Sequence, residues 1–209
     1  MTALHLSDAD AAADLARYAQ RAKRLDPEGG MRLQALGSVL AVWVRVLPGD
    51  GLTQSGLVLG LRTMALTEPN EVDVTVPIGA ITDRISRDGT GVVPVPPATL
   101  TEPWAVVTPP RAEWEDVGRL EPDAIREAAR AGIEEVATGA PEGSGAAIVA
   151  ELRRRVWARP TPTQPAIPAG GALGLETLGF LVGRGPVEVR RQGPWTRLTT
   201  PFGHVLVRR

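Results

Sequence analysis

The chain has 209 residues, of which 43% are hydrophobic and 22% charged, a composition typical of a globular protein with a buried core. It contains no cysteine, which excludes disulfides, thiolate nucleophiles and cysteine-bound metal sites. The formal net charge of −1 argues against the overall basic character of many nucleic-acid-binding proteins.

The first half of the sequence predicts one helix followed by antiparallel strands. Ser7 or Asp8 can cap a helix that ends at residue 25, because apolar residues recur there at helical spacing. Pro77 can begin a second, short helix. The six prolines between residues 89 and 110 predict an extended surface segment that Trp104 anchors. Alternating apolar residues predict the strands of this half over 31–36, 39–47, 57–66 and 72–76.

The second half predicts three helices and then three short strands. Pro122 can begin a helix to about residue 137, and Ser144 can cap a helix to residue 157. A less regular helix is expected over 172–181. The acidic run 113–123 is interpreted as a solvated approach to the first of these helices. Short apolar alternations between turn residues predict the closing strands over 187–191, 195–199 and 204–207.

The predicted fold class is therefore α+β, with antiparallel β meanders near both ends of the chain packed with about four helices. We expect residues 1–209 to form a single compact α+β unit. A helix followed by a meander occurs at both ends, and the segments around Trp43 and Trp195 share a loose pattern. An organisation into two related halves, 1–110 and 111–209, therefore stays open.

Charge is distributed unevenly along the sequence. Residues 1–150 carry 13 basic and 21 acidic side chains, a balance of −8, whereas residues 151–209 carry 10 arginines and 3 glutamates, a balance of +7. The basic third can neutralise the acidic part of its own chain, or it can face an anionic partner. Under the second interpretation the candidate contacts are Arg153, Arg154, Arg155, Arg190, Arg191 and Arg197.

The same third has the element order of a winged helix-turn-helix. Two helices, over 145–157 and 172–181, precede an arginine-rich hairpin. The connector between these helices is long and rich in proline, where that motif has a short turn. Nucleic-acid binding is therefore the alternative hypothesis and not the first one.

No catalytic, cofactor-binding or metal-binding residue is predicted. The two histidines, His5 and His204, lie at opposite ends of the chain, and no serine has the surroundings of a nucleophile elbow. The glycine-rich turns at 143–145 and 170–171 lack the context of a phosphate-binding or dinucleotide-binding loop. We expect no cofactor, and an enzyme that uses paired carboxylates remains a third hypothesis.

Protein association is the favoured function. The chain has five tryptophans, and tryptophan and arginine are the residues that most often anchor interfaces. The exposed edges of two short meanders also invite strand pairing between copies. The sequence thus predicts a non-enzymatic binding or assembly protein, with a second copy or another protein as its partner. No secretory leader and no membrane-spanning run is visible, so a cytoplasmic location is expected.

Three stretches of the sequence resemble a group of bacterial proteins. KRLDP at 23–27, PPRAEW at 109–114 and WTRLTTPFGHVLVRR at 195–209 are similar to uncharacterised actinobacterial proteins. The resemblance implies a bacterial cytosolic protein of unassigned function. It transfers no catalytic or binding residue.

Overall fold

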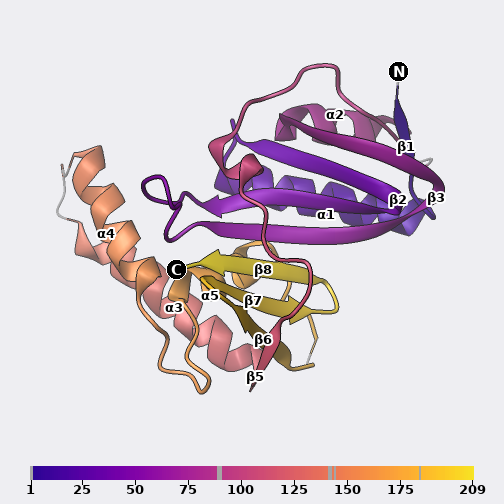
Figure 1. Cartoon of the computed structure of the whole chain (residues 1–209). Helices are drawn as coiled ribbons and strands as arrows, with labels where there is room; N and C mark the ends of the chain where they lie inside the picture. Colours follow the sequence, from indigo (N-terminus) through magenta and orange to yellow (C-terminus); the bar gives the residue numbers. More distant parts are fainter. Residues whose placement is uncertain (1, 89–90, 141–142, 144, 184) are drawn as a thin grey trace. The chain divides into compact units, whose positions relative to one another are not determined.

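The computed structural model describes residues 2–88, 91–140, 143, 145–183 and 185–209. Contacts divide the chain into unit 1, formed by Met1–Val46 and Gly60–Thr108, and unit 2, formed by Leu47–Leu59 and Pro109–Arg209. The predicted α+β class is confirmed, because the described residues form five α-helices with antiparallel strands near both ends of the chain (Figure 1). Among these residues, none of the helices has the length and apolarity needed to cross a membrane.

Unit 1 packs helices against a long two-stranded ribbon. Tyr18 lies on the buried side of the first helix, and its hydroxyl donates to the carbonyl of Val42 at 3.5 Å. The cap of that helix is Asp8, whose Oδ1 accepts from the Ala11 amide at 2.7 Å, as predicted. This hydrogen bond lowers the pKa of the Asp8 carboxyl. The elements of the unit are β1 (Ala3–His5), α1 (Ala9–Leu25), β2 (Gly30–Leu47), β3 (Val58–Pro77), α2 (Ile78–Asp88), β4 (Val92–Pro94) and a 3-10 turn (Pro103–Val106).

Four separate strands were predicted over residues 31–76, and the structure has two long strands there instead. Residues 31–36 and 39–47 belong to one strand, β2, and 57–66 and 72–76 belong to β3. Gly37 adopts a φ of 59°, which a residue without a Cβ tolerates, so the strand continues through the irregularity. The turn signal at this glycine therefore marks a local distortion within β2.

Charged side chains anchor the proline-rich segment in addition to Trp104, the anchor that the sequence predicts. The Arg32 guanidinium donates to both carboxylate oxygens of Asp73 at 2.7 Å and to the carbonyl of Ala105 at 2.6 Å. Arg45 pairs with Asp26 at 2.6 Å and with Glu102 at 3.4 Å. Trp104 is only 2% exposed, so the segment carries its own apolar anchor.

Unit 2 places one buried helix on an antiparallel sheet in the strand order β8-β7-β6-β5. The start of β3 lies beside β8, since the Leu57 carbonyl accepts from the Arg208 amide at 2.9 Å. A Cβ on Gly171 would lie 2.7 Å from Leu198, so this glycine lets the helix approach the sheet closely. The elements are β5 (Glu115–Leu120), α3 (Pro122–Gly139), α4 (Ala146–Ala158), α5 (Ala169–Thr177), β6 (Val187–Gln192), β7 (Trp195–Thr200) and β8 (Gly203–Arg208).

The acidic run is the main error in the predicted elements of this unit. Residues 115–120 form β5, which pairs with β6 so that Glu115 lies opposite Arg191 and Arg119 lies opposite Glu188. The run is therefore not merely a solvated approach to α3, because a basic strand distant in sequence accepts it as a partner.

Two helix boundaries also differ from the predicted ones. The helix expected over 172–181 occupies Ala169–Thr177, and Gly179 follows it with a φ of 71°. Ser144, the predicted cap of α4, lies outside the described residues, and Gly145 occupies the N-cap position. Pro122 begins α3 as predicted.

The contact between α3 and α4 gives a stability test. A Cβ on Gly132 would lie 2.4 Å from the ring of Trp157, which is itself buried. We expect Gly132→Ala to lower the free energy of unfolding by about 1–2 kcal/mol, because overpacking outweighs the gain of about 1 kcal/mol in helix propensity. Chemical denaturation followed by tryptophan fluorescence measures the change.

Gly185→Ala is the matched control, since nothing lies within 4 Å of a Cβ at that position and the residue is exposed. Its free energy of unfolding should stay within about 0.5 kcal/mol of the parent value. Equal effects of the two substitutions would contradict the packing argument.

Candidate functional site

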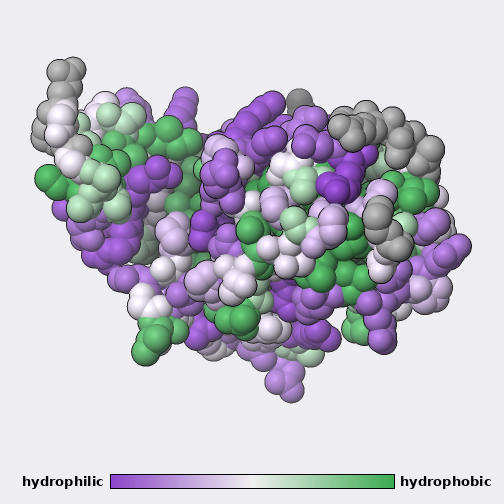
Figure 2. Space-filling view, turned by 90° about the horizontal axis from the view of Figure 1, so that it is seen from above, coloured by the Kyte–Doolittle hydropathy of each residue, from purple (hydrophilic) through white to green (hydrophobic). Residues whose placement is uncertain are grey.

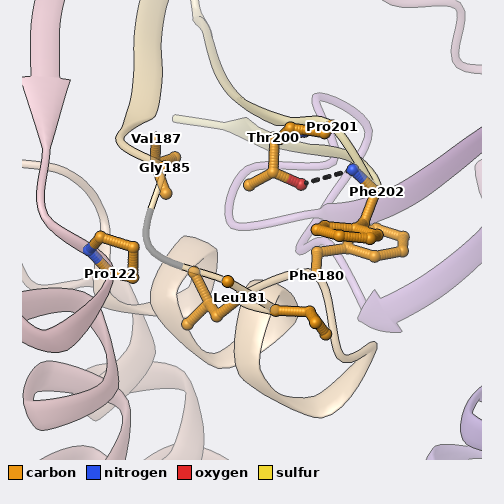
Figure 3. Close-up of a pocket in the computed structure, with 10 residues that line it drawn as sticks. Pro122, Phe180, Leu181, Gly185, Val187, Thr200, Pro201 and Phe202 are labelled. Atoms are coloured by element: carbon orange, nitrogen blue, oxygen red, sulfur yellow. Dashed lines mark hydrogen bonds between the residues drawn. The ribbon is translucent and has the colours of Figure 1, made fainter.

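Unit 2 contains an apolar hollow of about 190 Å³. Figure 3 shows its walls, which come from the start of α3, the segment after α5 and the turn between β7 and β8. The side chains around it include Pro122, Phe180, Leu181, Val187, Pro201 and Phe202. No titratable residue is among the described residues that line it, so the hollow suits an apolar side chain better than acid–base chemistry.

Hydrogen bonds hold the walls of this hollow. The Thr200 hydroxyl donates to the Gly203 carbonyl at 3.2 Å and accepts from the Phe202 amide at 3.1 Å, which fixes the turn that carries Phe202 (Figure 3). On the opposite side Arg126 donates to the carbonyl of Leu181. The hollow is thus formed by three segments distant in sequence, and no local pattern could have predicted it.

The three predicted arginines of α4 are exposed. Figure 1 shows α4 beside α3, with its first turns far from the β5–β8 sheet. Arg154 makes two hydrogen bonds to the Glu151 carboxylate, at 2.6 and 2.8 Å, and these bonds lower the pKa of Glu151. Arg153 and Arg155 make no ion pair with any described residue. A partner can therefore reach two of the three guanidinium groups without breaking an existing pair.

The other three predicted arginines lie in the sheet and face two different ways. Arg190 on β6 and Arg197 on β7 are directly opposite in the antiparallel register, so their side chains share one face. Arg191 points to the other face, where its Nη2 donates to the carbonyl of Ala166 at 2.7 Å. Arg191 is thus hydrogen-bonded to the loop before α5. The six predicted arginines therefore do not form one cluster.

Most of the charge asymmetry of the sequence disappears within the units. Unit 2 contains 14 arginines and 13 acidic residues by sequence, a balance of +1, because it combines the basic third with the acidic run around β5 and α3. Unit 1 has 9 basic and 11 acidic residues, a balance of −2. These counts favour neutralisation within the chain over a broadly basic surface.

Two further arrangements bear on the alternative hypotheses. Seven successive residues of α5, Ala169–Leu175, are buried, so this helix cannot serve as the base-reading helix of a winged helix-turn-helix. His5 lies on β1 and His204 on β8, where its Nδ1 is 3.0 Å from the Thr199 hydroxyl. Within the part of the chain that the structure describes, no three His, Asp or Glu side chains are placed to hold a metal ion.

The fold is sliding-clamp-like. A DNA polymerase sliding clamp from Pseudomonas aeruginosa aligns with a TM-score of 0.56 and 13% identity over 99% of this chain. A putative DNA polymerase III beta subunit from Eubacterium rectale aligns over 100% with a TM-score of 0.61 and 6% identity. The beta subunit from Thermotoga maritima gives 0.58 and 10% over 99%. This chain spans 64% of the length of each, and such low identity establishes the fold alone.

Two sequence families match the chain, one on each side of residue 107. Residues 1–106 match the domain of unknown function DUF8010, and residues 109–209 match the domain of unknown function DUF8185. The chain belongs to the DUF8010 family, whose model covers just over half of it. No curated protein matches the chain. That the two parts arose as related halves stays a prediction.

The turn beside the hollow gives a second stability test. We expect Thr200→Val to lower the free energy of unfolding by about 1–2 kcal/mol, because it removes both hydrogen bonds of a buried hydroxyl. The NMR signals of the Phe202 ring should shift as the turn loosens.

Thr63→Val on β3 is the control, since that residue is exposed and its hydroxyl bonds to no described residue. A Phe202 signal that stays in place in Thr200→Val would show that the hydroxyl does not hold the wall of the hollow.

Proposed function

We propose that the protein is a non-enzymatic assembly protein that acts through protein–protein contacts, with a second copy of itself as the first partner. The observation that carries the proposal is the sliding-clamp-like fold, which extends over the whole chain. The proteins that share this fold are named as a sliding clamp and as a subunit of a DNA polymerase. Both names describe components of larger assemblies. This step is an argument by fold analogy, and the strand edges of the chain support it independently.

The edge strand β2 is the surface that best fits strand pairing between copies. In the described part of the chain β2 has a neighbouring strand, β3, on one side only. It is 18 residues long, and its centre exposes Leu36 (61%) and Val39 (51%). A long edge strand with unpaired backbone groups and exposed apolar side chains favours the addition of a strand from another chain.

The opposite edge strand, β5, has the features that prevent such pairing. It is only six residues long and carries Glu115, Asp116 and Arg119. Its register shifts between Asp116 and Gly118, where Gly118 has a φ of 135°. Charged side chains and a bulge both block the approach of another strand, so β2 and not β5 is the proposed interface.

The apolar surface alone does not identify the interface. On the face drawn in Figure 2, apolar side chains form separate patches among polar ones. A continuous apolar surface of the size that marks a stable interface is therefore not evident on that face. The proposed interface accordingly depends on the backbone edge of β2, with Leu36 and Val39 as its apolar contacts.

Analytical ultracentrifugation over a range of protein concentrations tests this interface. We expect the parent chain to form dimers, and we expect Leu36→Lys with Val39→Lys to raise the dimer Kd at least about tenfold, because like charges would meet at the pairing edge. Leu52→Lys is the matched control, since that leucine is fully exposed in the loop between β2 and β3. A parent chain that stays monomeric at the highest concentration would exclude self-association.

Nucleic-acid binding by α4 is the second candidate function. Arg153 and Arg155 are exposed and unpaired with described residues, and the similar structures are named as DNA polymerase clamps. Guanidinium groups that contact phosphates release counterions, so their binding weakens as salt rises.

Fluorescence anisotropy with duplex DNA across a salt series tests this candidate. We expect Arg153→Gln with Arg155→Gln to reduce the salt slope by about 2, and the same change at Arg21 and Arg24 on α1 to leave it unaltered. Binding that is absent even at low ionic strength would remove the candidate.

A further inference from the structure

We propose that Arg190 and Arg197 form a binding site for a phosphate group on the face of the β6–β7 hairpin. The two arginines are directly opposite in the register, a position in which Cβ atoms are about 4.5–5.5 Å apart. Like charges in this position destabilise a sheet unless another group compensates for them. The proposed site does not depend on the assembly function.

The hydrogen-bond donors of the pair are incompletely satisfied. The Nε atoms of both arginines are buried and have no acceptor among the described residues. Arg190 is paired with Glu188, at 3.1 Å through Nη2, whereas Arg197 makes no ion pair with any described residue. Buried polar groups are normally hydrogen-bonded, so two such N–H groups on adjacent strands indicate a missing acceptor.

The guanidinium group of Arg197 is partly removed from water. Its guanidinium carbon lies 4.7 Å from the centroid of the Trp114 ring, and this contact covers one side of the cation. Burial, followed by the repulsion from Arg190, lowers the pKa of Arg197. The attraction of an anion between the two guanidinium groups would offset both effects.

The other charged groups on this face are unevenly distributed around Arg197. Asp116 lies opposite Arg190 on the β5 side, and its Oδ1 accepts from the Gly118 amide at 2.9 Å. Glu188 is engaged with Arg190. On the β8 side Arg208 lies over the ring of Trp195, 5.5 Å from its centroid, and adds a further positive charge. The carboxylates thus lie towards β5, and the face towards β8 is positive.

The geometry favours a phosphate over a stacked base. Arg197 covers the Trp114 ring, and Trp195 is only 2% exposed, so neither ring offers a platform for a base. A phosphate group presents several acceptor oxygens, and a monoester carries up to two negative charges at neutral pH. It can therefore accept hydrogen bonds from both guanidinium groups at once. A single carboxylate has only two oxygens and offers fewer acceptor positions.

Side-chain NMR of the arginine Nε–H groups tests the proposal on the whole chain. Inorganic phosphate is added at constant ionic strength, with chloride as the compensating anion. We expect the Nε–H signals of Arg190 and Arg197 to shift together and to saturate. Arg197→Gln should weaken this binding at least about tenfold, as expected for the loss of a charge-assisted, two-point contact.

Two further variants control for charge and for folding. Arg21→Gln removes the same charge from an exposed position on α1 and should leave phosphate binding unchanged within about twofold. Arg197→Lys keeps the charge but loses the planar fork, so it should bind phosphate with intermediate affinity even if Arg197→Gln is unstable. Unchanged phosphate binding in a folded Arg197→Gln variant would overturn the proposal.

A parallel titration with an oligonucleotide that carries only diester phosphates distinguishes the two sources of the group. Saturable shifts at both arginines with inorganic phosphate assign a free or monoester phosphate. Saturable shifts with the oligonucleotide alone assign a nucleic-acid backbone and also support the site. Shifts with neither probe, or shifts of equal size with added chloride, would overturn it.

Discussion

The pairing of β5 with β6 is the interaction on which unit 2 depends. It joins the acidic middle of the sequence to its basic third, with Glu115 opposite Arg191 and Arg119 opposite Glu188. Opposite charges in directly opposed positions stabilise an antiparallel pair and also fix its register. Because β5 ends at Leu120 and α3 begins at Pro122, the same pairing fixes the start of α3, and Pro122 is one wall of the hollow.

Close approach to glycine is the second constraint on the unit. A Cβ on Gly174 would lie 2.9 Å from Val205, and one on Gly171 would lie 2.7 Å from Leu198, so α5 can lie directly on β7 and β8. Glycine lowers intrinsic helix propensity by about 1 kcal/mol per residue, and α5 is nevertheless helical because its packing against the sheet outweighs that preference. The low helix propensity explains why the predicted boundaries of α5 are less accurate than those of α1 or α3.

Local signals predicted the elements that depend on local physics. The Asp8 cap, Pro122 at the start of α3 and the closing hairpins are contained within a few residues of sequence, and the structure confirms them. The strands β1, β4 and β5 were missed, because each is short and its partner strand is distant in the sequence. The arginines of the candidate site could be named from composition, but the opposition of Arg190 to Arg197 requires the register.

A protein that works by binding need not bring catalytic groups together, and its sites are better sought where a folded chain leaves groups unsatisfied. The free edge of β2 exposes backbone donors and acceptors, and the Arg190–Arg197 pair buries two N–H groups without a described acceptor. The buried N–H groups cost free energy in the isolated chain, whereas water can hydrate the edge of β2, and a partner of the right chemistry could satisfy either set of groups. The edge belongs mainly to unit 1 and the arginine pair to unit 2, so substitution at one can be separated from substitution at the other.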